Sequence, residues 1–243
     1  MAELNARRYF LEVLLPAYRE FRESYTAREI GLRVDTRKAG ALAQALIGMP
    51  EYVYLERKEE LPFRSAREYR ETLWKSSPSY ELVCDVGNAI KHGKVSRTGR
   101  LVNGPGCIEE RVALIEVLDV TGSYFISRKI LLVKTQIGRV AELGSAFNSS
   151  LRLWISELRE RKVSPEAIEG PTLRLEIYDK ADPRGQGEFL VHMLEGEPDG
   201  INLTFLTYDV TNGILKLGWR PQGPDFSVDI PFRAVVRTAA GEI

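Results

Sequence analysis

Histidine and cysteine are scarce in this chain, with two of each among 243 residues. Cys84 lies in a segment expected to be helical and Cys107 in a loop rich in glycine and proline, so the pair forms neither a CxxC metal site nor a disulfide framework. Reduced thiols, the usual state in the cytosol, are therefore expected. His92 and His192 are the only imidazoles, which disfavours His-rich metal sites. We expect no metal and no other cofactor.

A net charge is also lacking, because 34 basic residues balance 34 acidic ones. No overall field therefore steers the chain toward nucleic acid or anionic lipid. No apolar run approaches the roughly 18–20 residues that a membrane span needs. The opening residues mix charges without an apolar core, unlike a signal peptide; they read MAELNARRYFLEVLL. We expect a cytoplasmic protein without a membrane partner, and the 44% apolar content predicts a packed core.

Several common catalytic motifs are absent from the sequence. There is no GxxxxGK[ST] phosphate loop, no GxGxxG after a strand, no GxSxG elbow and no HExxH pair. Enzymes that depend on a bound nucleotide or metal ion are therefore disfavoured.

The N-terminal third has helical periodicity. Apolar residues recur at steps of three and four over 4–25, where Pro16 is expected to kink or split the helix. A second helix is expected through 41–48, with Gly48 and Pro50 as stop signals and a loop over 49–62. These patterns predict the first half of a helical bundle.

Two further helices have clear start signals. Ser65 and Glu68 form a capping box ahead of a short helix through Trp74. Ser77 followed by Pro78 begins the next helix, which runs to His92, and Gly93 follows as a left-handed C-terminal residue. The sequence therefore predicts a helical bundle over residues 1–95.

The pattern changes to β-strand after Gly104-Pro105-Gly106. Two runs, 111–120 and 124–134, predict a hairpin, and 140–161 returns to a helical period. Alternation then dominates, and Asn212-Gly213 marks a hairpin turn. The further expected strands are 173–178, 188–194, 201–208, 214–219 and 226–237. The predicted fold is α+β: a helical bundle (1–95), a hairpin plus long helix (96–163) and an antiparallel β region (164–243).

A polar stripe on the helix that ends at His92 is the strongest candidate for chemistry. Glu81, Asp85, Asn88 and His92 lie three or four residues apart and so share one helix face. In a functional interpretation, His92 is the central residue, and Asp85 and Asn88 orient it. In a structural interpretation, His92 interacts with the helix dipole and the last carbonyls.

The stretch Gly87-Asn88-Ala89-Ile90-Lys91-His92-Gly93 resembles the signature of HEPN domains: arginine, a polar residue, three variable residues and histidine. Asn88 matches the polar position and His92 the histidine, whereas Gly87 replaces the arginine. The resemblance implies a bundle of four or five helices that forms a homodimer and cleaves RNA without metal, in RNA metabolism or phage defence. A looser resemblance is to bacterial proteins that have Asn-Ala-x-Lys-His before a β-rich region, and it implies no activity.

The missing arginine bears directly on activity. RNA cleavage develops negative charge at phosphate, which a positioned guanidinium stabilises, and Gly87 offers none. The resemblance therefore implies the fold and RNA binding more than metal-independent ribonuclease activity, and we lean toward a protein that is not an enzyme.

Four cations follow the stripe within ten residues that contain no acid. They could hold phosphates of an RNA strand, without reading its sequence. The alternative is an ordinary solvated loop. These residues are Lys91, Lys94, Arg97 and Arg100.

A different class of function remains open beside the RNA hypothesis. The chain is then a non-enzymatic scaffold that docks a protein partner through its β-rich part, by an exposed sheet edge or apolar patch. That hypothesis predicts that His92 can be replaced without loss of function.

Overall fold

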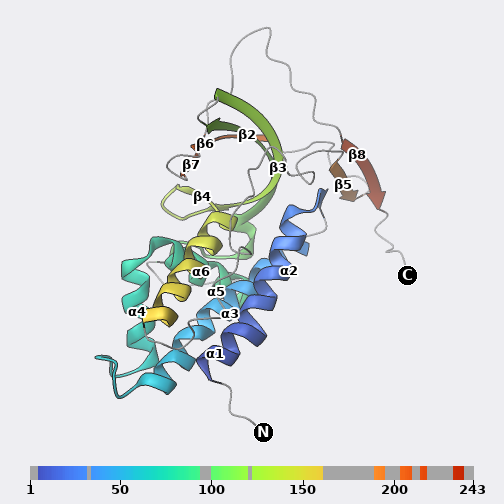
Figure 1. Ribbon diagram of the computed structural model, residues 1–243. Helices are drawn as coiled ribbons and strands as arrows, with labels where there is room; N and C mark the ends of the chain where they lie inside the picture. Colours follow the sequence, from blue (N-terminus) through green and yellow to red (C-terminus); the bar gives the residue numbers. More distant parts are fainter. Residues whose placement is uncertain are drawn as a thin grey trace. The chain divides into compact units, whose positions relative to one another are not determined.

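The computed structural model describes eight stretches of the chain, and all structural statements concern these residues. Helices come first and most strands follow, so the predicted α+β class is confirmed (Figure 1). None of the described helices has an apolar stretch of the length needed to cross a membrane. The described stretches are 5–31, 34–93, 100–119, 122–160, 189–194, 203–209, 214–217 and 232–237.

The chain divides into two compact units, each of which combines segments distant in sequence. The first contains the described residues of Met1–Ser24, Val34–Glu109 and Leu131–Arg174. The second contains those of Tyr25–Arg33, Glu110–Ile130 and Leu175–Ile243. The helices of the bundle belong to the first unit, apart from the last two residues of the helix that ends at Thr26.

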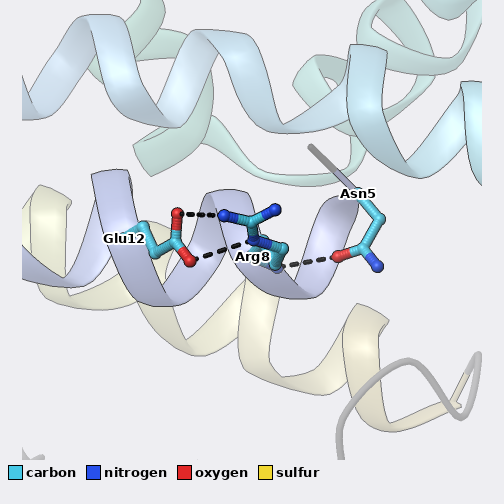
Figure 2. A network of polar contacts seen from close by, with 3 residues as sticks. All are labelled: Asn5, Arg8 and Glu12. Atoms are coloured by element: carbon cyan, nitrogen blue, oxygen red, sulfur yellow. Dashed lines mark hydrogen bonds and ion pairs between the residues drawn. The ribbon is translucent and has the colours of Figure 1, made fainter. Parts of the chain in front are cut away.

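The first helix, α1 (Ala6–Tyr9), begins with a side-chain cap. The Asn5 Oδ1 atom accepts a hydrogen bond from the Arg8 backbone N–H at 2.9 Å, and the Arg8 guanidinium donates to both carboxylate oxygens of Glu12 at 3.0 and 3.2 Å (Figure 2). The cap contributes about 1 kcal/mol to stability. The ion pair is exposed, so it adds little.

Pro16 shapes the helix that follows, as predicted. A π-helical turn, Phe10–Leu14, separates α1 from α2 (Leu15–Thr26). The Leu15 N–H reaches back five residues to the Phe10 carbonyl oxygen. Because proline has no N–H, the regular helical ladder cannot continue through it, and the wider turn ends two residues before it.

The prediction that Pro50 ends the second helix is wrong. α3 spans Val34–Arg57, with Pro50 inside it, so 51–57 is helical. Proline leaves the carbonyl four residues back without its usual donor, and here that carbonyl belongs to Leu46. The buried Tyr80 hydroxyl of another helix donates to this oxygen at 3.1 Å. A distant side chain thus replaces the missing bond, which the local sequence could not indicate.

Gly48 is likewise no stop signal. A Cβ atom at this position would collide with the Tyr9 hydroxyl oxygen. That hydroxyl donates to the Ala45 carbonyl oxygen at 3.1 Å, and the Tyr9 ring stacks on Tyr52 at a centroid distance of 4.1 Å. The glycine therefore allows Tyr9 to approach the middle of α3.

The remaining helices of the bundle pack around a buried aromatic cluster. The Trp154 ring meets Tyr69 and Tyr80 edge-on, with centroid distances of 6.3 and 5.9 Å. Helix α6, which carries Trp154, packs against α5 and α3. Burial raises the pKa of the Tyr80 hydroxyl well above its usual value. These helices are α4 (Ala66–Ser76), α5 (Pro78–His92) and α6 (Leu143–Glu160).

The predicted capping box of α4 forms, except that the Glu68 carboxylate bonds the N–H of the residue before the N-cap rather than that of Ser65 itself. Ser65 Oγ accepts from the Glu68 N–H at 3.2 Å, while the Glu68 carboxylate accepts from the Arg64 N–H at 2.8 Å.

Helix α6 begins three residues later than predicted, because 140–142 forms a strand. Glu142 then caps α6, since its carboxylate accepts from the N–H groups of Gly144 and Ser145 at 2.6 and 2.7 Å.

The described strands form two sheets. One has the order β4-β3-β2-β6-β7, in which β2 and β3 are neighbours as the predicted hairpin requires. The other has the order β1-β5-β8. The strands are β1 (Glu29–Ile30), β2 (Ile108–Asp119), β3 (Gly122–Lys134), β4 (Val140–Glu142), β5 (Phe189–Leu194), β6 (Leu203–Asp209), β7 (Ile214–Leu217) and β8 (Phe232–Arg237).

The C-terminal region is not wholly antiparallel, which corrects the prediction. Strands β6 and β7 are antiparallel, as the Asn212-Gly213 turn signal indicated. However, β5 pairs with β8, and β6 with β2, in parallel. Side-chain alternation has the same period in both pairings, so it identifies a strand without identifying its partner. The predicted strand 173–178 lies outside the described residues.

The Tyr80 hydroxyl gives the first testable prediction. We expect Tyr80→Phe to lower the free energy of unfolding by about 1–3 kcal/mol, because the buried Leu46 carbonyl loses its donor. Pro50→Ala restores an N–H four residues after Leu46, so Tyr80→Phe should cost less in that background. Urea unfolding of the wild type, both single variants and the double variant measures this coupling. An equal cost in both backgrounds would contradict the account.

Candidate functional site

Helix α5 carries the polar stripe and is enclosed by its own chain. It packs against α3, α4, α6 and the 3-10 turn Pro105–Cys107. As predicted, the Ser77 hydroxyl oxygen accepts from the Tyr80 N–H at 3.3 Å, and Gly93 follows the helix with a φ of +69°. The exposed side chains of α5 are Pro78 at its start and Lys91 and His92 in its last turn.

Asp85 is buried and both its carboxylate oxygens are engaged. Oδ1 accepts from Arg100 Nη1 at 2.5 Å, and Oδ2 accepts from the Leu101 backbone N–H at 2.6 Å. Only 1% of the Asp85 side chain is exposed, against 16% for Arg100. The Arg100 guanidinium also lies over the Trp74 ring, 5.0 Å from its centroid. Asp85 thus holds the chain against α5 at residues 100 and 101.

Asp85 and His92 are not brought together. They lie seven positions apart in the sequence, which is about 10 Å along a helix axis. The Asp85 oxygens bond to Arg100 and Leu101, and His92 is exposed in the last turn. Asn88, half-buried, lies between them. The stripe therefore shares a face without forming a hydrogen-bonded catalytic constellation of the kind that acid–base chemistry needs.

Gly87 lies where α5 meets α3. A Cβ atom there would lie 2.7 Å from Ile47 Cδ1 and 3.0 Å from Ala43 Cβ. Its carbonyl oxygen accepts from Gln44 Nε2 at 2.7 Å. The position that the HEPN resemblance assigns to arginine is therefore a close helix–helix contact that leaves no room for a long side chain.

The four predicted RNA-binding cations do not share one environment. Lys91 is exposed beside His92, whereas Arg100 is engaged with Asp85 and Trp74. Lys94 and Arg97 lie outside the described residues.

Glu81 and Cys84 are the other titratable groups near Asp85. Burial raises the pKa of Glu81, the negative charge of Asp85 raises it further, and Arg100 acts in the opposite direction. Burial raises the pKa of the Cys84 thiol to about 12, so this thiol is unreactive at neutral pH.

Cys107 is half-buried, and its Sγ lies 3.1 Å from Asn103 Oδ1. Both cysteines are free thiols, and the described residues contain no metal-binding group of three or more His, Cys, Asp or Glu.

A second group of charged side chains lies in the second unit. Arg28 donates to the Ser127 carbonyl oxygen at 3.1 Å and to its hydroxyl oxygen at 3.0 Å. Burial, together with the charge of Arg128, lowers the pKa of Arg28 to about 10. Lys129 Nζ donates to the Glu29 carbonyl oxygen at 2.7 Å. These cations connect β1 to β3.

The turn between β3 and β4 presents apolar side chains, which the sequence reasoning missed. Ile137 is 63% exposed and Val140 is 37% exposed. The turn is nevertheless well bonded: the Gly138 N–H donates to the Thr135 carbonyl at 3.0 Å, and the Thr135 N–H donates to the Arg139 carbonyl at 2.8 Å. An isoleucine beside a glycine in a turn was the available signal. We call residues 135–140 the β3–β4 turn.

Strand β4 is also an edge. It is the last of the described strands in its sheet and pairs antiparallel with β3, with Val140 opposite Lys134. One backbone hydrogen bond joins Thr135 to Arg139, from the Thr135 N–H to the Arg139 carbonyl oxygen, while the Arg139 N–H donates to the Thr135 hydroxyl. Because residues that bond across an antiparallel ladder alternate with residues that do not, the N–H and C=O of Val140 point away from β3. Val140 thus offers both an apolar side chain and backbone bonding groups.

Comparison of the chain with protein-family models, with curated proteins and with solved structures finds no match.

The contact at Gly87 gives the second prediction. We expect Gly87→Arg to lower the free energy of unfolding by about 1–3 kcal/mol or more, because the side chain overpacks the α3 contact. Asn88→Arg, at the half-buried neighbouring position, is the matched control and should cost much less. Urea unfolding measures both. A Gly87→Arg variant as stable as the control would show that this position can take the arginine of the HEPN signature.

Proposed function

We propose that this chain is a non-catalytic binding protein that holds an extended segment of a partner protein against the β3–β4 turn and the edge of β4. The observation that carries this proposal is the exposure of Ile137 and Val140 on a turn held by backbone hydrogen bonds. The hypothesis of a non-enzymatic protein that docks a partner at a sheet edge is therefore favoured over catalysis. The docking surface consists of the β3–β4 turn and the edge of β4.

The energetics of the turn favour binding. Complete burial of one aliphatic side chain contributes about 1.5–3 kcal/mol. The Thr135 hydroxyl accepts from the Arg139 N–H and donates to its carbonyl oxygen, both at 3.0 Å, in addition to the backbone bonds. A turn fixed in this way loses little conformational entropy when a partner covers it. The apolar area can therefore contribute to affinity with little ordering cost.

The chemistry of the surface indicates an extended partner segment. The outward N–H and C=O of Val140 can pair with a strand added at the edge, and Ile137 supplies an apolar contact. Arg139 is exposed and cationic. The best-matched partner segment has apolar and polar residues in alternation, and it carries a carboxylate that can face Arg139.

The geometry of α5 supports a binding role over a ribonuclease. Asp85 is committed to Arg100 and Leu101, and Gly87 is packed against α3. A HEPN-type homodimer would bring two such helices together, yet α5 is covered by α3, α4 and α6. The last turn of α5, where Lys91 and His92 are exposed, is the part of this helix that a second copy of the chain could contact.

The third prediction concerns peptide capture. Short random peptides can be displayed on phage and selected for binding to the full chain. The selected peptides should converge on sequences in which apolar and polar residues alternate and which include Asp or Glu. Ile137→Asp should weaken their binding by at least about tenfold, or 1.4 kcal/mol. Leu55→Asp is the matched control, because Leu55 is an apolar residue of α3 that is 69% exposed. Equal weakening by both variants, or peptides without this pattern, would contradict the proposal.

A second proposal rests on the exposure of Lys91 and His92 at the end of α5. We propose that this turn binds RNA phosphates weakly and without cleavage. It is compatible with the first proposal because the two surfaces differ. The imidazole alone, without a paired guanidinium, lacks the group that would stabilise the charge developed at phosphate.

The fourth prediction tests RNA binding directly. In metal-free buffer, the wild type should leave single-stranded RNA intact and bind it in a salt-dependent way. Lys91→Ala should reduce the slope of log affinity against log salt by about 0.7, the value for one lost phosphate contact on a single strand. Fluorescence anisotropy over a salt series measures the slope. Cleavage that His92→Ala abolishes would instead establish a HEPN-type nuclease.

A further inference from the structure

We infer that Asp85 is a positioning residue for the β3–β4 turn, acting through Leu101. This inference rests on the proposed function, and it assigns the central carboxylate of the polar stripe a role in setting the binding surface.

Both backbone polar groups of Leu101 are hydrogen-bonded. Its N–H donates to Asp85 Oδ2 at 2.6 Å, and its carbonyl oxygen accepts from the Gln136 N–H at 2.8 Å. Gln136 is the residue directly before Ile137. Two hydrogen bonds and one residue therefore connect the interior of α5 to the apolar part of the turn.

Arg100 holds the first part of this connection in place. Its guanidinium donates to Asp85 Oδ1 at 2.5 Å and lies 5.0 Å from the centroid of the Trp74 ring. With Oδ1 engaged by Arg100, Oδ2 is directed to the Leu101 N–H. Val102, the next residue, is fully buried, which fixes the segment from the other side.

The turn is attached to the bundle at its other end as well. Glu142, at the end of β4, accepts from the N–H groups of Gly144 and Ser145 at the start of α6. Helix α6 packs on α5. Ile137 and Val140 lie between these two attachments, so release of the Gln136 attachment leaves the turn attached to the bundle at the Glu142 end.

Asp85→Asn is the substitution that breaks the connection with the least change in shape. An amide has one acceptor oxygen, and its NH₂ group would face either the Arg100 guanidinium or the Leu101 N–H, which are both donors. Leu101 or Arg100 then loses its partner. A carboxylate is therefore required at this position.

Gln136→Pro breaks the connection at the opposite end. The bond from the Gly138 N–H to the Thr135 carbonyl defines a turn in which Gln136 is the second residue, a position that favours proline. The substitution keeps this turn and removes the N–H that donates to Leu101. It leaves Asp85 and Arg100 untouched.

The experiment measures amide hydrogen exchange at residue 136 and affinity for the selected peptides, in the full chain. Asp85→Asn should speed exchange of the Gln136 amide by at least about tenfold, the sign of local opening, and weaken peptide binding by at least about tenfold. Gln136→Pro should weaken binding similarly, and the double variant no further. Lys134→Gln, which breaks the neighbouring pair with Glu109, is the control and should change neither measurement.

The outcomes separate this inference from the proposed function. Unchanged exchange at Gln136 in Asp85→Asn would overturn the inference, whatever happens to the peptide. Additive losses of affinity in the double variant would also overturn it. If Asp85→Asn does not fold, full affinity in Gln136→Pro would overturn it. Failure of Ile137→Asp to weaken peptide binding would refute the proposed function, while the exchange result would still decide whether Asp85 holds the turn.

Discussion

A carboxylate that is removed from water must have its lone pairs satisfied, and this requirement organises the centre of the first unit. Asp85 meets it with the Arg100 guanidinium and the Leu101 N–H. Both donors lie beyond the end of α5, so the chain has to return along the helix to supply them. Gly104, whose added Cβ would lie 3.0 Å from the Gly93 carbonyl oxygen, shows how closely it returns. The polar face of α5 thus serves as an attachment surface for its own chain.

Local chemistry predicted much of the helical part. Ser77 and Pro78 begin α5, Gly93 follows it, and Ser65 caps α4, because these preferences depend on backbone groups within a few residues. Pro50 shows where local reasoning ends. Its helix-breaking effect is offset by the Tyr80 hydroxyl, which comes from a residue thirty positions later in the chain.

The candidate site was harder to predict for the same reason. The helix that carries the polar stripe was predicted, but the partners of Asp85 lie fifteen and sixteen residues further along the chain, and that of Gly87 lies on α3. Helical spacing gives no information on either. The exposure of Ile137 depends on which strands pair, and side-chain alternation does not indicate strand partners. The parallel pairs β2/β6 and β5/β8 were missed for the same reason. Long-range pairing, rather than side-chain pattern, determines where a surface is left open.

The most direct test of the central claim is to locate a bound peptide on the protein by nuclear magnetic resonance. Backbone amide shifts are followed while a selected peptide is titrated into the labelled chain. The account predicts that the largest changes fall on the β3–β4 turn and β4, with little change at Lys91 and His92. Changes concentrated at the last turn of α5, with Ile137 and Val140 unaffected, would contradict it.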